Sequence, residues 1–145
     1  MDIIHEIDSE AHYEIVKDDE LRNGDFATTD VISKTIKIRE DIYDKACEGD
    51  PFARMVIVHE FSHFATINVY GFELAMNSGK GKIKTYEDPE WQAKCLAGEL
   101  MMPYDKIQEL SLNEIKEKCG VTTNAILTHL KIKPLKALFQ GSNRG

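Results

Sequence analysis

The chain has no long apolar run, few cysteines and fewer basic than acidic residues. No stretch of its 145 residues approaches the roughly 18 consecutive apolar residues that a membrane span requires. Its first residues, MDIIHEIDSE, lack the basic-then-apolar order of a signal peptide. The three cysteines, Cys47, Cys95 and Cys119, are too scattered for a disulfide framework or a CxxC redox site. We therefore expect a cytoplasmic protein with no membrane contact, in which the cysteines are small core residues.

The shortage of positive charge argues against a nucleic-acid-binding protein. The chain carries 18 Lys and Arg against 25 Asp and Glu, a net charge of −7, which argues against direct nucleic-acid binding. The balance reverses from Asp105 onward, where seven basic residues face four acidic ones. We interpret this basic tail as a solvated helical face in preference to a contact surface.

The strand signals lie at the start of the chain. The segments HYEIVKDDEL (12–21) and SKTIKIRE (33–40) show short period-two alternation, and RNGDF (22–26) between them is a turn signal. These patterns predict a small antiparallel β-meander that ends near Glu40. The next segment, DIYDKACEG (41–49), predicts a short helix that ends at Gly49.

Two helices with the same start signal follow. Asp50-Pro51 opens DPFARMVIVHEFSHFATI (50–67), because Asp is a good N-cap and Pro suits the first helical position. Asp88-Pro89 opens a second helix in the same way, and Pro103 ends it. Both helices are largely apolar, so we expect them to be buried. The remaining segment, residues 111–139, predicts two or three short amphipathic helices broken at Gly120 and Pro134.

The motif VIVHEFSHF (56–64) places polar groups in an apolar helix. His59 and His63 are four residues apart, which puts them about 40° apart on one helix face, where both can reach one ion. Glu60 lies at the flank of that face and can approach a water without being a ligand. This is the HExxH arrangement, in which the two histidines bind zinc and the glutamate takes a proton from water. Two core histidines bonded to backbone carbonyls are the simpler alternative.

A catalytic zinc ion needs a third protein ligand and an open position. Val69 stands where the longer metzincin motif has a third histidine, so that motif is excluded. We prefer Glu90, because Ala93, Ala97 and Gly98 are small enough to let the second helix pack closely on the first. The downstream candidates are Glu73, Glu87, Asp88, Glu90, Glu99 and His129.

These residues resemble the ImmA/IrrE-type metallopeptidases. That family combines HExxH with a later helix of the form E-x-(E/Q)-A-x-x-F-A-x-x-L-L-M-P, and the resemblance covers about residues 25–130. Ser62, Leu96 and Lys94 depart from the usual residues of the pattern. The matching positions are His59, Glu60, His63, Glu90, Gln92, Ala93, Ala97, Leu100, Met102 and Pro103.

The resemblance implies a zincin-like, gluzincin-type α+β domain. Its small antiparallel sheet would pack on the HExxH helix and on the Glu-bearing helix, with residues 1–104 as the metal-binding core and 105–145 as a helical tail. His59, His63 and Glu90 would bind Zn²⁺, and Glu60 would be the general base. The implied function is cleavage of a helix-turn-helix repressor in prophage, mobile-element or stress regulation.

The alternative is a non-catalytic, zinc-stabilised regulatory module. It would bind a repressor or DNA through its C-terminal helices, where GVTTNAI (120–126) resembles part of a helix-turn-helix. Glu60 argues against this alternative, because a purely structural metal site needs no general base.

Overall fold

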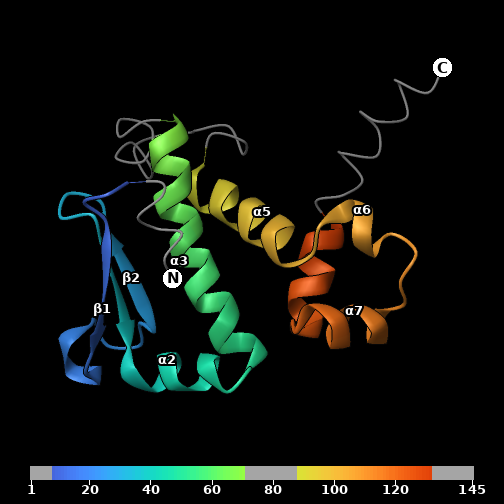
Figure 1. Ribbon diagram of the computed structural model, residues 1–145, viewed down its shortest axis with the longest axis horizontal. Coiled ribbons are helices and arrows are strands. Elements are labelled where there is room, and N and C mark those ends of the chain that lie inside the picture. The colour runs from blue at the N-terminus through green and yellow to red at the C-terminus, as the bar shows by residue number, and fades with distance from the viewer. Residues whose placement is uncertain (1–7, 71–87, 132–145) are drawn as a thin grey trace.

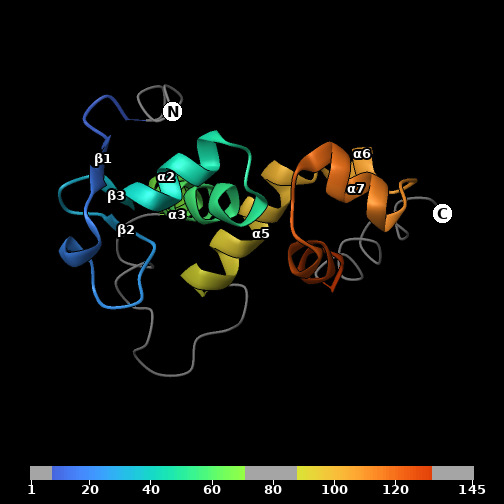
Figure 2. The ribbon, with the colours of Figure 1, turned by 90° about the horizontal axis from the view of Figure 1, so that it is seen from below.

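The computed structural model of the chain describes residues 8–70 and 88–131, which form an α+β fold. A three-stranded sheet packs on the long helix α3 (Pro51–Tyr70). Figures 1 and 2 show α3 between the sheet and α5 (Pro89–Met101), with the C-terminal helices beyond α5. Within the described ranges, no helix combines the length and the apolar character needed to cross a membrane.

The sheet is mixed, so the predicted antiparallel meander is wrong. β1 (His12–Val16) pairs in parallel with β3 (Thr35–Arg39), and β2 (Ala27–Asp30) pairs antiparallel with β3 at the other edge. The segment RNGDF belongs to a longer connection that begins with the 3-10 helix η1 (Asp18–Glu20). This connection lets the chain reach the far edge of the sheet before β3 returns through the middle. Side-chain alternation fixes which face a residue occupies, but not which strands are neighbours.

The turn between β2 and β3 is made by side-chain hydrogen bonding. Asp30 Oδ1 accepts hydrogen bonds from the backbone N–H of Ile32 at 2.9 Å and of Ser33 at 3.2 Å. Lys34 then adopts a left-handed conformation with φ 55°. An aspartate that bonds to the backbone just after it can close a turn that contains no glycine. β2 was not predicted from the sequence, because no glycine marks the turn that follows it.

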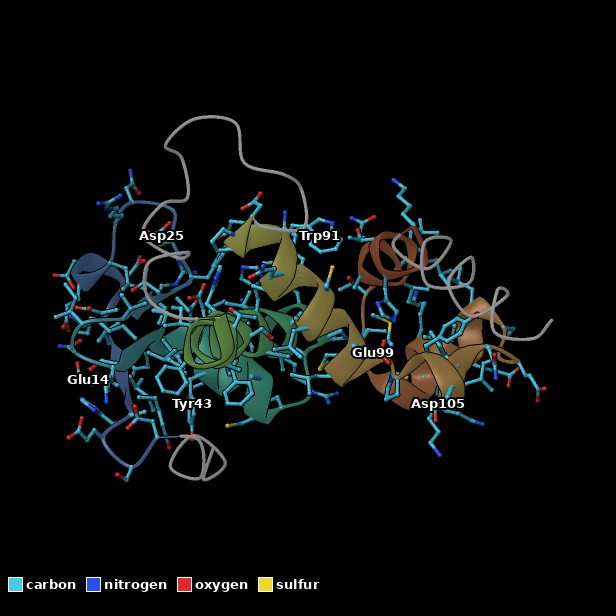
Figure 3. The ribbon with its side chains drawn as sticks, turned by 90° about the horizontal axis from the view of Figure 1, so that it is seen from above. Glu14, Asp25, Tyr43, Trp91, Glu99 and Asp105 are labelled. Atoms are coloured by element: carbon cyan, nitrogen blue, oxygen red, sulfur yellow. The ribbon has the colours of Figure 1, made fainter. Side chains whose placement is uncertain are left out.

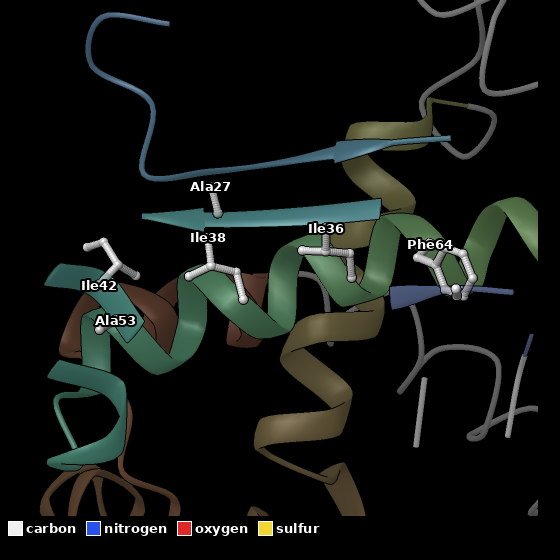
Figure 4. Close-up of a cluster of buried hydrophobic side chains, with 7 residues drawn as sticks. Ala27, Ile36, Ile38, Ile42, Ala53 and Phe64 are labelled. Carbon is white, nitrogen blue, oxygen red and sulfur yellow. The ribbon is translucent and has the colours of Figure 1, made fainter. Parts of the chain in front are cut away.

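The main core lies between the sheet and α3. Ile36 and Ile38 of β3 are completely buried and face α3, as Figure 4 shows. α2 (Glu40–Cys47), which matches the predicted short helix, contributes the buried Ile42. Phe61 of α3 packs against this core. The buried members of the cluster are Ala11, Ala27, Ile36, Ile38, Ile42, Ala53 and Phe64.

Both predicted helix starts are confirmed. Asp50 Oδ1 accepts a hydrogen bond from the Ala53 N–H at 2.8 Å, and Asp88 Oδ1 accepts one from the Glu90 N–H at 3.0 Å. α5 ends at Met101, before Pro103, as expected. The expected burial is only partly correct, because Phe52 of α3 is 47% exposed and Leu100 of α5 is 51% exposed.

A second core holds the C-terminal helices together. α6 (Tyr104–Ile107), α7 (Leu112–Cys119) and the helical residues 123–131 enclose an apolar cluster next to the end of α5. The break at Gly120 is confirmed, since this residue ends α7 with φ 61°, whereas Pro134 lies outside the described residues. The buried members are Met102, Ile107, Ile115, Val121, Ala125 and Ile126.

The cysteines are less buried than expected. Cys47 is exposed, and Cys95 and Cys119 are only partly buried. Cys47 occupies the last position of α2 and is exposed, so its expected role as a core residue is wrong.

The α3 cap gives a first prediction. Asp50→Ala should lower the free energy of unfolding by about 1 kcal/mol, because the Ala53 N–H loses its side-chain acceptor. Urea unfolding measures this change. Asp44→Ala removes an exposed carboxylate inside α2 and should change the value by no more than about 0.5 kcal/mol. Equal effects of the two changes would contradict the assigned cap.

Candidate metal centre

Three side chains from two helices meet at one point. His59 and His63 stand one turn apart on α3, and Glu90 stands in the first turn of α5. The Nε2 atoms of the two histidines lie 3.0 Å apart. Glu90 Oε1 lies 3.0 Å from Nε2 of His63, and Glu90 Oε2 lies 3.4 Å from Nε2 of His59. One ligand atom from each residue lies within 4.8 Å of the others, so the group could hold a metal ion.

The packing of α5 on α3 creates this meeting point. Ala93 is 0% exposed and Ala97 is 5% exposed, and Gly98 is buried beside them. α3 packs more extensively against α5 than against any other element. Close approach of the two helices, which Ala93 and Ala97 predicted, is therefore confirmed, whereas Gly98 faces His129 of the helix at 123–131 and not α3. The Asp88 cap fixes the start of α5, so Glu90 projects from a defined turn.

The spacing of the three ligand atoms suits a small ion in a tetrahedral site. Bonds of about 2.0–2.2 Å to nitrogen and oxygen place neighbouring tetrahedral ligands roughly 3.3 Å apart. The two Nε2 atoms are 3.0 Å apart, and each lies 3.0 or 3.4 Å from a different oxygen of the Glu90 carboxylate, which is close to that value. Three protein ligands leave a fourth position open, which is the arrangement of catalytic sites in preference to structural ones.

The surroundings favour the neutral form of His59. Burial lowers the pKa of His59 below its ordinary value, and the neighbouring His63 and Lys94 lower it further, while Glu90 opposes them. Metal binding requires an imidazole without its extra proton. The apolar helix therefore holds His59 in the form that can bind an ion at neutral pH.

Glu60 lies on the sheet side of the three ligands. Its Oε2 accepts a hydrogen bond of 2.7 Å from the Thr29 hydroxyl of β2. Burial raises the pKa of this carboxyl, the Thr29 hydrogen bond and His63 lower it, and Glu90 and Asp25 raise it further. The net result is a carboxylate more basic than an exposed one, fixed beside the ligands without belonging to them. The role of Thr29 could not be predicted from the sequence, because Thr29 lies 31 residues before Glu60, on a strand that was not predicted.

The other candidate ligands lie elsewhere or serve another purpose. Asp88 caps α5. His129 is buried, with Nε2 3.0 Å from the Met102 carbonyl oxygen and 3.6 Å from Glu99 Oε2. Figure 3 shows Glu99 near the C-terminal helices, away from the start of α5. Glu73 and Glu87 lie outside the described residues.

Two cavities flank Glu60. The larger has a volume of about 620 Å³ and extends past His59 to the C-terminal helices. The smaller has a volume of about 340 Å³ and extends past His63 and Glu90. Asp25, Ala27 and Glu60 line both cavities, which therefore form two parts of one groove along β2.

No protein-family model, curated protein or solved structure matched the chain. The resemblance to the ImmA/IrrE-type metallopeptidases therefore rests on the motif positions themselves.

The ligand set gives a second prediction. Glu90→Ala should weaken zinc binding by at least about 10²-fold, because a ligand contributes more than the outer groups whose loss costs 10–100-fold. His59→Ala and His63→Ala should have similar effects. Competition with a chromogenic chelator measures the affinity. Glu99→Ala, a change at the other end of α5, should leave the affinity for zinc nearly unchanged. If Glu99→Ala and Glu90→Ala weaken zinc binding equally, Glu90 is not the third ligand.

The buried Glu60 gives a third prediction. Burial raises the pKa of Glu60 in the folded protein above its value in the unfolded chain, which is about 4.3. The free energy of unfolding therefore falls as the pH rises from the unfolded pKa through the folded pKa, because the buried carboxyl must lose its proton. In the presence of a chelator, Glu60→Gln should therefore be more stable than the unchanged protein at pH 7. The difference should shrink as the pH falls to 4. Urea unfolding at several pH values measures it, and a difference independent of pH would contradict the burial effect.

Proposed function

We propose that the chain is a cytoplasmic zinc-dependent endopeptidase with a zincin-like fold. One observation carries the proposal: His59, His63 and Glu90 converge from two helices, and Glu60 lies beside them without joining them. A purely structural metal site does not need a basic carboxylate that lies next to its three ligands without binding the ion. In a hydrolytic site of the HExxH type, such a carboxylate acts as the general base.

The donor set favours zinc among the common ions. Two imidazole nitrogens and one carboxylate, with an open fourth position, are the ligands of several zinc hydrolases, whereas magnesium and calcium prefer oxygen ligands. When bound, zinc would acidify water and polarise the carbonyl group of a peptide bond.

Glu60 would act as the general base and then as the general acid. Its carboxylate would take the proton of the attacking water and pass it to the nitrogen of the leaving amine. The Thr29 hydroxyl holds one carboxylate oxygen at 2.7 Å and leaves the other for the water. Because burial raises the pKa of Glu60, the carboxylate is a stronger base than an exposed glutamate.

The edge of β2 supports an extended peptide as substrate. The Arg39 N–H donates to the Phe26 carbonyl at 3.0 Å, so alternate residues along β2 pair with β3. The backbone groups of Ala27 and Thr29 would then point away from β3, towards the groove that contains Glu60. A peptide that adds to this edge would pass directly in front of the candidate site.

A helix-turn-helix repressor is the substrate that we propose. The support is the motif resemblance, and the acidic net charge is consistent with a protein partner in preference to DNA. The rival function, DNA or repressor binding through the C-terminal helices, is less well supported. Thr122, Ala125 and Thr128 line the larger cavity, so one face of the helix at 123–131 belongs to the groove. Salt-dependent DNA binding by the purified protein would favour the rival.

The general base gives a fourth prediction. Glu60→Gln should keep zinc and fold but lower cleavage by about 10²-fold or more, because an amide cannot accept the proton of water. The substrate to test is the product of any helix-turn-helix gene that neighbours the gene of this chain, with cleavage followed by gel electrophoresis and mass spectrometry.

Glu99→Gln makes the same chemical change outside the site and serves as the control, with an unchanged rate expected. Cleavage by Glu60→Gln at the full rate, with zinc bound, would remove Glu60 from the mechanism. Absence of cleavage by the unchanged, zinc-loaded protein would count against the repressor as substrate.

A further inference from the structure

The larger cavity is unusual in its apolar walls. Phe26, the residue just before β2, and Phe52 of α3 stand edge to face with ring centroids 5.2 Å apart. They are 38% and 47% exposed, although aromatic side chains of this size are usually covered. Met55 and Val56 of α3 continue the apolar wall towards His59.

The opposite wall comes from a distant part of the sequence. Ala97 and Gly98 of α5 line the cavity together with Ala125 and Thr128 of the helix at 123–131. This helix lies close to α5, because a Cβ atom on Gly98 would come within 2.6 Å of Nδ1 of His129. The missing side chain at Gly98 therefore allows the C-terminal helices to close the far side of the cavity.

The smaller cavity, on the other side of Glu60, has a different character. Its walls combine polar and acidic groups such as Thr29, Glu60 and Glu90 with apolar ones such as Val31 and Ile67, so it is more polar than the larger cavity. A chain lying along β2 would therefore meet an apolar environment on one side of the candidate site and a more polar environment on the other.

We propose that the larger cavity is the specificity subsite, which binds apolar side chains of the substrate on one side of the scissile bond. This inference rests on the proposed peptidase function. A volume of about 620 Å³ lies within the range of pockets that bury whole small ligands, so the cavity can hold more than one side chain. His59 and Glu60 line its inner end, which makes it continuous with the site of chemistry. The substrate is thus a segment with at least two large apolar residues next to the cleaved bond.

The occupant that fits best is the substrate and not a second copy of the chain. The cavity leads to the candidate metal ligands, and the backbone edge of β2 runs along it. A peptide in the groove would be held both by its backbone, along β2, and by its side chains, in the cavity. A second copy could cover the aromatic pair without approaching His59 or Glu60.

The subsite can be tested with hydroxamates, which bind zinc without being cleaved. The probes are two series of Leu-Phe hydroxamates. In the first series the hydroxamate is at the carboxyl end of Leu-Phe, and in the second it is attached to the amino end through a malonyl group. The two series place Leu-Phe on opposite sides of the metal site. The matching Gly-Gly compounds and acetohydroxamic acid are the references. Dissociation constants are measured by calorimetry on the zinc-loaded protein. In one of the two series, the Leu-Phe compound should bind at least about 10²-fold more tightly than its Gly-Gly partner.

Two neighbouring residues of the C-terminal helix provide matched variants. Thr128 is exposed and lines the cavity, whereas Leu127 is 48% exposed and does not. Thr128→Trp should abolish the preference for Leu-Phe, because the indole would occupy the cavity. Leu127→Trp should keep the preference, and neither change should alter the affinity for acetohydroxamic acid.

A second pair of variants covers the case in which Thr128→Trp does not fold. Phe52→Ala should reduce the preference for Leu-Phe by about 10-fold. Tyr13→Ala removes an aromatic residue that is 37% exposed and stacks on Tyr43, outside both cavities, and should have no effect.

Equal affinities for the Leu-Phe and Gly-Gly compounds in both series, or no binding of any of them, would overturn the subsite. If Thr128→Trp changes the mass of the protein in sedimentation but leaves the preference for Leu-Phe over Gly-Gly unchanged, the cavity is part of a dimer surface. That result would also overturn the subsite. Selective binding without cleavage of any peptide would support the subsite and overturn the proposed peptidase function.

Discussion

The close packing of α5 on α3 is the contact on which the rest of the site depends. Ala93 and Ala97 present almost no side chain at this contact, so the two helix backbones approach each other. A larger residue at either position would push α5 outward and take Glu90 away from the two histidines. The same contact sets the width of the larger cavity, because Ala97 and Gly98 line it. One run of small residues thus controls both the candidate ligand geometry and the space beside it.

The site concentrates polar groups in a helix that would otherwise be a simple core element. His59, Glu60 and His63 are all partly buried, and each has a polar neighbour: Glu90 for the histidines and Thr29 for Glu60. Ser62 is completely buried and donates a 2.7 Å hydrogen bond to the Val58 carbonyl of the same helix. The polar groups of α3 therefore satisfy one another in part, at a cost in stability that a purely apolar helix would avoid. Such a cost is typical of functional sites and is not expected of a structural core.

The helices and the ligand group could be predicted because their signals are local. Asp50-Pro51 and Asp88-Pro89 mark helix starts within two residues, and the spacing of His59 and His63 fixes a shared face within one turn. The order of the strands could not be predicted in this way, since it depends on which distant segments pair. Thr29 illustrates the difference: nothing in its neighbourhood marks it, and its importance comes only from its contact with Glu60 on another element. The cavity is a similar case, because its walls come from β2, α3, α5 and the helix at 123–131.

The position of the three candidate ligands has a consequence for how the chain folds. His59 and His63 belong to α3, Glu90 belongs to α5, and residues 64–89 of the sequence lie between them. An ion held by all three would join two helices that are distant in the chain, much as a covalent cross-link closes a loop. Such a link reduces the conformational entropy of the unfolded chain only if it forms there, and the three ligands come together only once α5 has docked on α3. Metal binding would then stabilise the docked arrangement of the two helices, because only that arrangement presents all three ligands together.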